Sequence, residues 1–248
     1  MSGHSKWHSI KHKKALVDAK KGKIFTTLSK AITLAAREKG GDLSTNFKLR
    51  LAVEKAREMN MPKDNIDRAI KRGTGESGGE VMEEMVYEAF GPGGVPLVIE
   101  TITDNRNRTV TNIKTVLGKK GGSLSGANSV LWMFERKGVV RVLESQLKRS
   151  GLGAEEAELV FIDLGADDLR LKKDDGAPYF EIIFPIDHLG AFQDFFNRKQ
   201  IKIEDMELEY LPKEKIKVDS KIQDQIKAIV DALGKDEDVT RIYTNIDF

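Results

Sequence analysis

GTGESGGEVMEEMVYEAFGPGGVPLVIETIT (residues 73–103) marks the point where the hydrophobic period of the chain changes. The first eight residues of this stretch are rich in glycine and carry two acids, a composition typical of a linker. Beyond them, residues 81–89 and 95–103 read as strands with a period of two, separated by the turn GPGG at 91–94. The pattern predicts an antiparallel hairpin.

Upstream of this point the apolar residues follow a helical period. The spacing predicts helices over about 23–40, 44–60 and 62–73, the last begun by Pro62 and stopped by Gly73. Residues 1–23 carry seven lysines, three histidines and one acid, without a sustained apolar stripe. We expect this segment to be an extended or loosely helical basic arm, joined to a small three-helix domain.

Downstream, the pattern predicts a helix over 106–118 and a third strand in which Val130, Trp132 and Phe134 alternate. A second unit follows Gly138 with the order βαββαβ, which is ferredoxin-like. Its expected elements are strand 139–143, helix 154–164, strand 169–173, strand 179–184, helix 187–199 and strand 203–210. A last helix at about 219–233 and a strand at 239–246 would complete the unit that began at Val81.

These elements predict an α+β protein of three domains. The first is the basic arm and three-helix domain, residues 1–75. The second is a split α/β domain, residues 80–137 plus 212–248. The third, residues 138–211, is inserted into the second, and both α/β domains are expected to be ferredoxin-like.

The charges are distributed unevenly between the ends of the chain. Residues 1–75 carry 18 Lys and Arg against 7 Asp and Glu, whereas the remaining residues carry 23 against 32. A basic block of this kind is typical of a surface for a polyanion, most simply nucleic acid or a nucleic-acid machine. We therefore expect DNA, ribosomal RNA or the ribosome as the partner.

Several classes of function find no support in the residues. There is no cysteine, which excludes thiol nucleophiles, disulfides and cysteine-ligated metals. The motifs of P-loop enzymes, zinc proteases and α/β-hydrolases are absent, and GTGESG at 73–78 follows a helix and precedes a strand, the reverse of a dinucleotide fingerprint. No apolar run is long enough to cross a bilayer and the N-terminus does not resemble a signal peptide. We expect a cytoplasmic, non-enzymatic protein with no cofactor, catalytic residue, metal site or small-molecule substrate.

The candidate nucleic-acid contacts are basic or aromatic residues of the first 75 positions. Lysines neutralise phosphates, and Trp7 either stacks on an unpaired base or anchors the arm. His4, His8 and His12 share a helical spacing but lack a neighbouring carboxylate, so phosphate contact is favoured over metal binding. The candidate set is Lys6, Trp7, His8, Lys11, His12, Lys13, Lys14, Lys20, Lys21, Lys23, Lys48, Arg50, Lys71 and Arg72.

A second polar site is predicted at TDNRNRT, residues 103–109. Either Thr103 or Asp104 caps the following helix. Arg106 and Arg108 would then lie in the first helical turn, where positive charge opposes the helix dipole. An acidic or phosphate partner would account for them, and we take Asp104, Arg106 and Arg108 as the members of this site.

Eight motifs along the chain strongly resemble the YebC/PmpR family, which includes mitochondrial translational activators of cytochrome oxidase. They are GHSKW at 3–7, IKHKK at 10–14, GKIFTTLSKAI at 22–32, AAREKGGD at 35–42, NMPKDNIDRAI at 60–70, GPGGV at 91–95, TDNRNRTV at 103–110 and WMFERKGVV at 132–140. The chain departs from the family at Leu43 and Phe47, where members often have proline. The resemblance implies three α+β domains and a regulator of gene expression without defined catalytic residues.

Two functions are compatible with this resemblance. The first is a transcriptional regulator that binds duplex DNA, for which a helix must present side chains to the major groove. The alternative is a ribosome-associated translation factor that relieves stalling, for example at proline-rich stretches, through contacts with ribosomal or transfer RNA. A basic arm with one aromatic residue suits structured RNA, whereas the labels of family members favour DNA.

Overall fold

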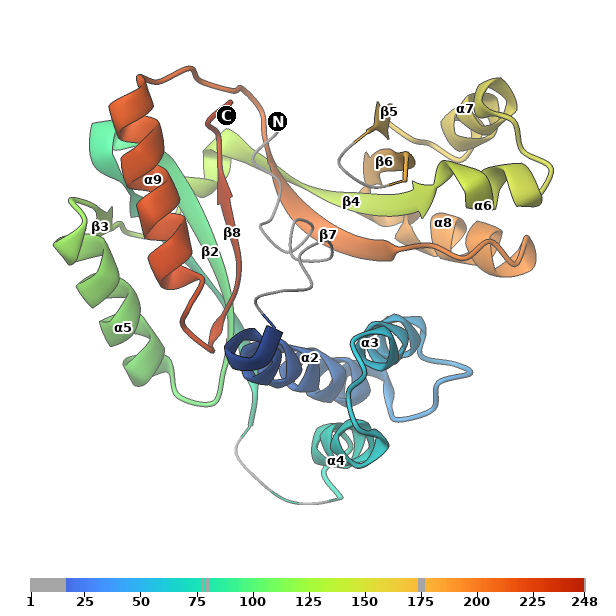
Figure 1. Ribbon diagram of the computed structural model, residues 1–248, viewed down its shortest axis with the longest axis horizontal. Coiled ribbons are helices and arrows are strands. Elements are labelled where there is room, and N and C mark those ends of the chain that lie inside the picture. The colour runs from blue at the N-terminus through green and yellow to red at the C-terminus, as the bar shows by residue number, and fades with distance from the viewer. Residues whose placement is uncertain (1–16, 77, 79–80, 174–176, 248) are drawn as a thin grey trace. The chain divides into compact units, whose positions relative to one another are not determined.

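The computed structural model describes residues 17–76, 78, 81–173 and 177–247 (Figure 1). The chain divides into two compact units. One contains the described residues up to Phe134 together with those from Pro212 onwards, and the other is Glu135–Leu211. The predicted separation of the first unit into a helical domain and a split α/β domain stays a prediction.

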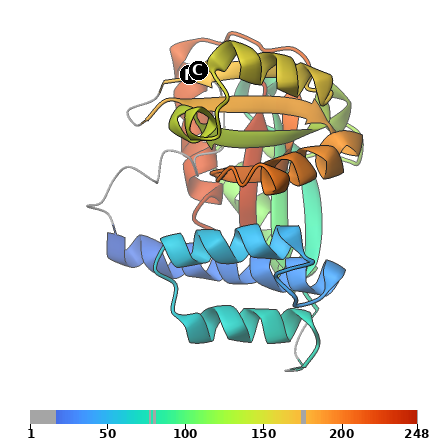
Figure 2. The same ribbon diagram turned by 90° about the vertical axis from the view of Figure 1, so that its right-hand side faces the viewer.

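The first unit begins with three helices, α2 (Val17–Lys39), α3 (Phe47–Glu58) and α4 (Lys63–Gly73). Both α3 and α4 pack against α2, which Figure 2 shows running along them. Their shared core is aliphatic and contains residues with no exposed surface, among them Ile32, Leu49 and Ala56. Burial of this apolar stripe, rather than helical propensity alone, holds helices of this length together.

Two residues set the approach of these helices. Asn46 caps α3 through its side-chain oxygen, and its amide nitrogen donates to the carbonyl oxygens of Ala35 and Gly40, both at 2.8 Å. Gly73, at the end of α4, lies so close to α2 that a Cβ atom there would be 2.4 Å from the backbone oxygen of Thr33. Only glycine allows this contact.

The same unit contains an antiparallel sheet in the order β3-β1-β2-β8. Its strands are β1 (Glu83–Phe90), β2 (Pro96–Thr103), β3 (Ser123–Leu124) and β8 (Val239–Thr244). The turn between β1 and β2 is a short 3-10 segment, Pro92–Gly94, in which Gly93 has a φ of 71°. Two helices, α5 (Arg106–Lys119) and α9 (Ser220–Leu233), pack together over this sheet (Figure 1).

The second unit contains a sheet in the order β5-β6-β4-β7. Its elements are β4 (Phe134–Leu143), α6 (Glu144–Arg149), α7 (Ala154–Asp163), β5 (Asp168–Lys172), β6 (Tyr179–Pro185), α8 (Leu189–Arg198) and β7 (Asp205–Pro212). Its core combines buried aliphatic residues with phenylalanines, and the rings of Phe184 and Phe192 stack with centroids 4.0 Å apart. The guanidinium of Arg141 is also buried, paired with carboxylates of Glu181 and Glu209.

The predicted α+β class is confirmed, with N-terminal helices and two four-stranded sheets. Apart from the short α6, the second unit has the expected βαββαβ order. The first sheet has the same two-layer form, but its element order is ββαβ followed by αβ, so it differs from the ferredoxin-like connection expected for it. The chain enters this sheet through a hairpin because GPGG closes a tight turn directly after β1.

The expected third strand around Val130 is wrong. Leu131–Met133 form a 3-10 turn, and Trp132 is 63 % exposed rather than alternating inward. The cause is the buried carboxylate of Glu88, which accepts hydrogen bonds from the backbone N–H groups of Asn128, Val130 and Leu131 at 2.6–2.8 Å. These donors are therefore not available to a strand, and β3 takes the place beside β1.

The first helix also differs from expectation, since α2 begins at Val17 and not near Lys23. The helix thus includes the last part of the segment expected to be an arm. Within the described residues, no helix has the length and apolar character needed to span a membrane.

Candidate nucleic-acid interface

The predicted interface falls partly outside the described residues. Lys6, Trp7, His8, Lys11, His12, Lys13 and Lys14 all lie there, as does His4. Lys20 and Lys21 lie near the start of α2. The structure describes the side chains of the other five candidates, which come from all three helices.

Lys23 does not extend from the surface of α2. Its partly buried ammonium group donates to the backbone oxygen of Asp236 at 2.6 Å and to that of Gly234, in the turn between α9 and β8. Burial lowers the pKa of Lys23, and the nearby carboxylates of Asp236 and Glu237 offset part of this effect. Lys23 therefore ties α2 to the end of α9, a structural role that the sequence did not indicate.

The candidates on α3 are engaged with neighbouring groups. The ammonium group of Lys48 lies 2.9 Å from a carboxylate oxygen of Glu38, and both side chains are about half exposed. The guanidinium carbon of Arg50 lies 5.1 Å from the centroid of the Phe47 ring, a cation–π distance. The exposed Lys48–Glu38 pair is of a kind that contributes little to stability, so a phosphate partner can replace it.

Both candidates on α4 are accessible. Lys71 and Arg72 are exposed in the last turn of the helix, while Ile66 and Ala69 form its buried face. Arg68 lies one turn before Arg72 and is also exposed. Residues four apart share a helix face, so Arg68 and Arg72 form a basic strip. Among the described residues, the side chain of Arg72 has no hydrogen-bond or ion-pair partner.

Asp104 and Arg108 of the second predicted site join an ion network whose central pair, Lys30 and Asp238, is buried. Lys30 on α2 donates to a carboxylate oxygen of Asp238 at 2.6 Å, and to the backbone oxygens of Ile102 at 3.0 Å and Glu237 at 2.9 Å. The side chains of Lys30 and Asp238 are 9 % and 3 % exposed. All three donor positions of the ammonium are filled, which is the condition for burying a charge.

Arg108 and Thr109 complete the network from the first turn of α5. The guanidinium of Arg108 reaches both carboxylate oxygens of Asp238 at 2.9 Å, and the Thr109 hydroxyl donates to Asp238 at 2.8 Å. Burial alone would raise the pKa of Asp238, but the hydrogen bonds from Lys30, Arg108 and Thr109 outweigh it and leave this pKa below its usual value. Asp104 adds a second carboxylate at 2.8 Å from Arg108.

This geometry explains the two arginines in the first turn of α5. Arg108 is held by Asp104 and Asp238, and Arg106 pairs with Glu83 on β1. The expected cap is wrong by one or two residues, because the side chain of Asn105 accepts the N–H of Arg108. The two arginines thus have carboxylate partners within the protein, and an external acidic or phosphate partner for them stays a prediction.

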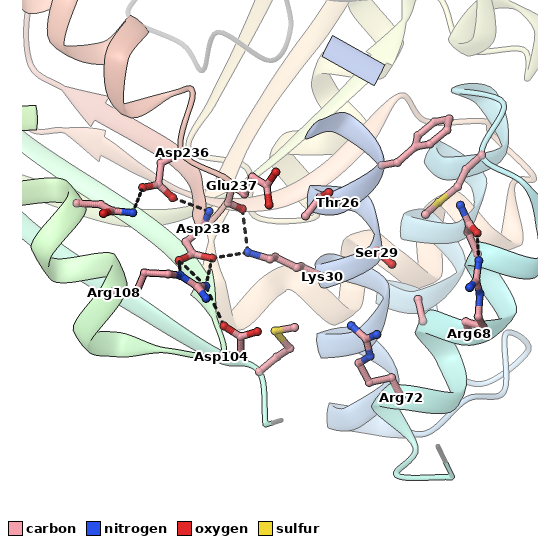
Figure 3. Close-up of a pocket in the computed structure, with 16 residues that line it drawn as sticks. Thr26, Ser29, Lys30, Arg68, Arg72, Asp104, Arg108, Asp236, Glu237 and Asp238 are labelled. Atoms are coloured by element: carbon pink, nitrogen blue, oxygen red, sulfur yellow. Dashed lines mark hydrogen bonds and ion pairs between the residues drawn. The ribbon is translucent and has the colours of Figure 1, made fainter. Parts of the chain in front are cut away.

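A groove with a volume of about 760 Å³ opens beside this network. Figure 3 shows α2 between its two sides, with Arg68 and Arg72 of α4 on one side and Asp104, Arg108 and Asp236 on the other. Thr26 and Ser29 of α2 also line it. Of the predicted residues, the structure brings Arg72, Asp104 and Arg108 together here, while Lys48, Arg50, Lys71 and Arg106 do not line it.

Sequence reasoning missed Lys30 and Asp238. One signal was available for Lys30, because a lysine on the buried side of a helix needs a partner for its charge. Nothing near Asp238 indicated its role, since its partner on α2 is 208 residues away in the chain. Within the described residues, no group of three histidine, aspartate or glutamate side chains is placed to hold a metal ion.

Comparison with known proteins places this architecture in one family. Residues 5–76 match the TACO1/YebC protein N-terminal domain, and residues 82–246 match the TACO1/YebC second and third domain.

Relatives align over the whole chain. A probable transcriptional regulatory protein of Caldanaerobacter subterraneus is 43 % identical over 247 residues, covering 100 % of this chain and 98 % of its own. A protein of the same description from Prosthecochloris aestuarii is 43 % identical over 250 residues, covering 100 % and 96 %. The crystal structure of a conserved hypothetical protein from Aquifex aeolicus superposes with a TM-score of 0.80 at 35 % identity, over 96 % of this chain and 95 % of that one. The chain therefore belongs to the TACO1/YebC family.

Proposed function

We propose that this protein is a non-enzymatic regulator of gene expression that binds nucleic acid through its basic N-terminal part. The observation that carries the proposal is the charge of residues 1–75, with 18 Lys and Arg against 7 acids. The exposed Lys71 and Arg72 on α4 belong to this surface. The names of the relatives, probable transcriptional regulatory proteins, support the same class of function.

The described side chains favour contact with phosphates over reading of bases. On α3, Lys48 is paired with Glu38 and Arg50 lies over Phe47, so this helix does not present a row of free side chains to a DNA groove. Cations at helix ends and on a basic arm neutralise phosphates without regard to sequence. We therefore expect strong dependence of binding on salt and weak discrimination between duplex sequences.

This expectation also favours the second candidate, a ribosome-associated translation factor. Structured RNA offers closely spaced phosphates and unpaired bases, which suit a basic surface without a recognition helix. In this form of the proposal the same residues contact ribosomal or transfer RNA and relieve stalled translation.

The first experiment measures the affinity of the full chain for a DNA duplex as a function of salt concentration. Replacing Lys11, Lys13 and Lys14 with alanine is expected to flatten the slope by about 0.9 for each lost phosphate contact. The matched control replaces Lys213, Lys215 and Lys217, which have similar spacing and are exposed outside the basic part. An equal change in both variants, or none in the first, contradicts the proposed location of the interface.

The second experiment distinguishes the two partners. The protein is sedimented with ribosomes at near-physiological salt. In parallel, a competition assay measures the ratio of its affinities for specific and random DNA duplexes. Co-sedimentation together with a DNA specificity ratio near one supports the translation factor. Sequence-selective DNA binding without co-sedimentation supports the transcriptional regulator, and absence of both contradicts the proposal.

A further inference from the structure

We propose that the groove between α4 and the α9–β8 turn is a binding site for a single nucleotide, with the phosphate at Arg68 and Arg72 and the base toward Glu237. This inference rests on the proposed function, because it gives one nucleotide of the bound nucleic acid a defined position. The groove volume of about 760 Å³ lies within the range of small-ligand sites, roughly 300–1,000 Å³.

The α4 side of the groove has the chemistry of a phosphate site. Arg68 and Arg72 are exposed, are one helical turn apart and both line the groove. The Arg68 side chain is oriented by hydrogen bonds to the backbone oxygen of Asp64 and to the side chain of Asn65. Arg72 has no such partner among the described residues, so its guanidinium is available for the two parallel hydrogen bonds that a phosphate accepts.

The opposite side has the reverse charge and cannot hold a second phosphate. Asp236, Glu237 and Asp238 follow one another along this side. Asp238 already accepts hydrogen bonds from Lys30, Arg108 and Thr109, and Asp236 accepts one from the side chain of Asn112 at 2.9 Å. Glu237 is exposed, and its carboxylate makes no hydrogen bond to another described residue. A carboxylate in this position accepts a hydrogen bond from the exocyclic amino group of a base.

Apolar and amide groups from α2, from α4 and from the residue just before the α4 N-cap complete the site. Phe25 on α2 is half-buried and lines the groove, and an aromatic side chain can stack on a base of any sequence. Met61 and Ala69 add apolar surface, while Asn65 contributes an amide. A phosphate alone would leave the acidic side unused and a nucleoside would leave the arginines unused, so a nucleotide fits this polarity best.

The carboxylate of Glu237 predicts which base the site prefers. Cytosine presents an amino donor where uracil presents a carbonyl acceptor, and Glu237 is an acceptor. We expect cytidine monophosphate to bind at least about fivefold more tightly than uridine monophosphate, the value of one discriminating hydrogen bond. Replacing Glu237 by glutamine is expected to remove most of this preference, because the glutamine amide can both donate and accept.

The test is a titration of the isotopically labelled full chain, in which binding is monitored through NMR chemical shifts. The probes are cytidine monophosphate, uridine monophosphate, cytidine, inorganic phosphate and an oligocytidine of six nucleotides. We expect saturable shifts at Ser29, Asn65, Arg72 and Glu237 with the nucleotides and weaker binding of cytidine or phosphate. Tighter binding of the oligonucleotide assigns the site to a strand, and tighter binding of the mononucleotide assigns it to free nucleotides.

Variants of α4 provide the decisive comparison. Arg72→Ala is expected to weaken binding of cytidine monophosphate about tenfold or more, because a charge-assisted contact is lost. Arg72→Lys keeps the positive charge but loses the paired N–H donors of the guanidinium, so its affinity should lie between those of the wild type and Arg72→Ala. Lys63→Ala, on an exposed residue at the other end of α4, is the matched control and should bind like the wild type.

The inference is overturned if the nucleotides do not bind. It is also overturned if their affinity is the same for the wild type, Arg72→Ala and Lys63→Ala. If long nucleic acid still binds with the expected salt slope in that case, the groove inference fails alone. If salt-dependent binding of long nucleic acid is absent while the nucleotide titration succeeds, the proposed function fails and the groove remains a nucleotide site.

Discussion

At the scale of single residues, Asp238 determines how α2, α5 and β8 meet. Its carboxylate is almost inaccessible and accepts hydrogen bonds from Lys30, Arg108 and Thr109. Breaking a buried ion pair by removing one partner is costly because the other charge stays buried without compensation. Lys30 would be left in this position, whereas Arg108 would keep its contact with Asp104.

We therefore predict that Asp238→Ala lowers the free energy of unfolding at pH 7 by about 3–5 kcal/mol. The measurement is chemical denaturation followed by circular dichroism. Asp224→Ala on α9 is the control, since that side chain is 80 % exposed and its contact with Lys227 is 4.0 Å long. It should change stability by less than about 0.5 kcal/mol. Similar losses in both variants would contradict a special role for Asp238.

The same residue predicts a dependence of stability on pH. Because the pKa of Asp238 is lowered in the folded state, its contribution is fully present above the unfolded pKa, near 4, and is lost as the pH falls through the folded pKa. The stability difference between wild type and Asp238→Ala should therefore be constant from about pH 5 to 7 and shrink below about pH 4. Denaturation curves at pH 7, 5, 4 and 3 test this, and a difference that grows on acidification would show the opposite sign.

At the scale of elements, the segment before β4 depends on one side chain from β1. Glu88 accepts three backbone N–H groups from the turn that carries the exposed Trp132. Three N–H donors satisfy the buried carboxylate well. Because these backbone N–H groups are bonded to Glu88, they do not pair with a neighbouring strand. The turn is thus ordered by a contact about 40 residues away in the chain rather than by its own sequence.

For this turn we predict that Glu88→Ala accelerates amide hydrogen exchange at Asn128, Val130 and Leu131 by at least about tenfold, because their acceptor is removed. Exchange in α3 should stay unchanged and serves as the internal control. Replacement of the nearby, half-buried Tyr87 by phenylalanine provides a control substitution on the same strand. Unchanged protection of the three amides in Glu88→Ala would mean that another interaction orders the turn.

At the scale of the whole molecule, the two compact units have cores of different composition. The core of the first unit is aliphatic, whereas that of the second adds stacked phenylalanines to its aliphatic residues, around a sheet that also buries Arg141. Arg141 is paired with Glu181 on β6, which Arg170 also approaches at 4.0 Å, and with Glu209 and Asp205 on β7, so the buried Arg141 contacts three carboxylates. The stability of the second unit should depend on this residue more than that of the first.

Accordingly, Arg141→Ala is predicted to destabilise the second unit by about 3–5 kcal/mol, because buried carboxylates lose their counter-charge. Hydrogen exchange measured along the chain should report faster exchange in β4, β6 and β7 and unchanged exchange in α3 and α4. Arg198→Ala, an exposed residue at the end of α8, is the matched control. If hydrogen exchange in Arg141→Ala were accelerated equally in both units, Arg141 would not stabilise the second unit separately from the first.

The sequence predicted most of the elements because their determinants are local. Apolar spacing, Pro62 and the GPGG turn define the helices and the hairpin within a few residues, and the insertion followed from the order of strands and helices. The same local reasoning failed around Val130, where an alternating pattern suggested a strand but Glu88 claims the backbone donors. It also listed the basic residues of the candidate site without showing which of them lie close together.

What the sequence by itself determined is the α+β class, the concentration of positive charge in residues 1–75 and the family resemblance. Only the tertiary structure decided which charges remain accessible. It engages Lys23 and Lys30 with groups more than 200 residues away, accounts for Arg106 and Arg108 internally, and leaves Arg68 and Arg72 facing an acidic side across a groove. The physical reason is that a buried charge requires a partner, and the partner is selected by folding rather than by neighbourhood in the chain.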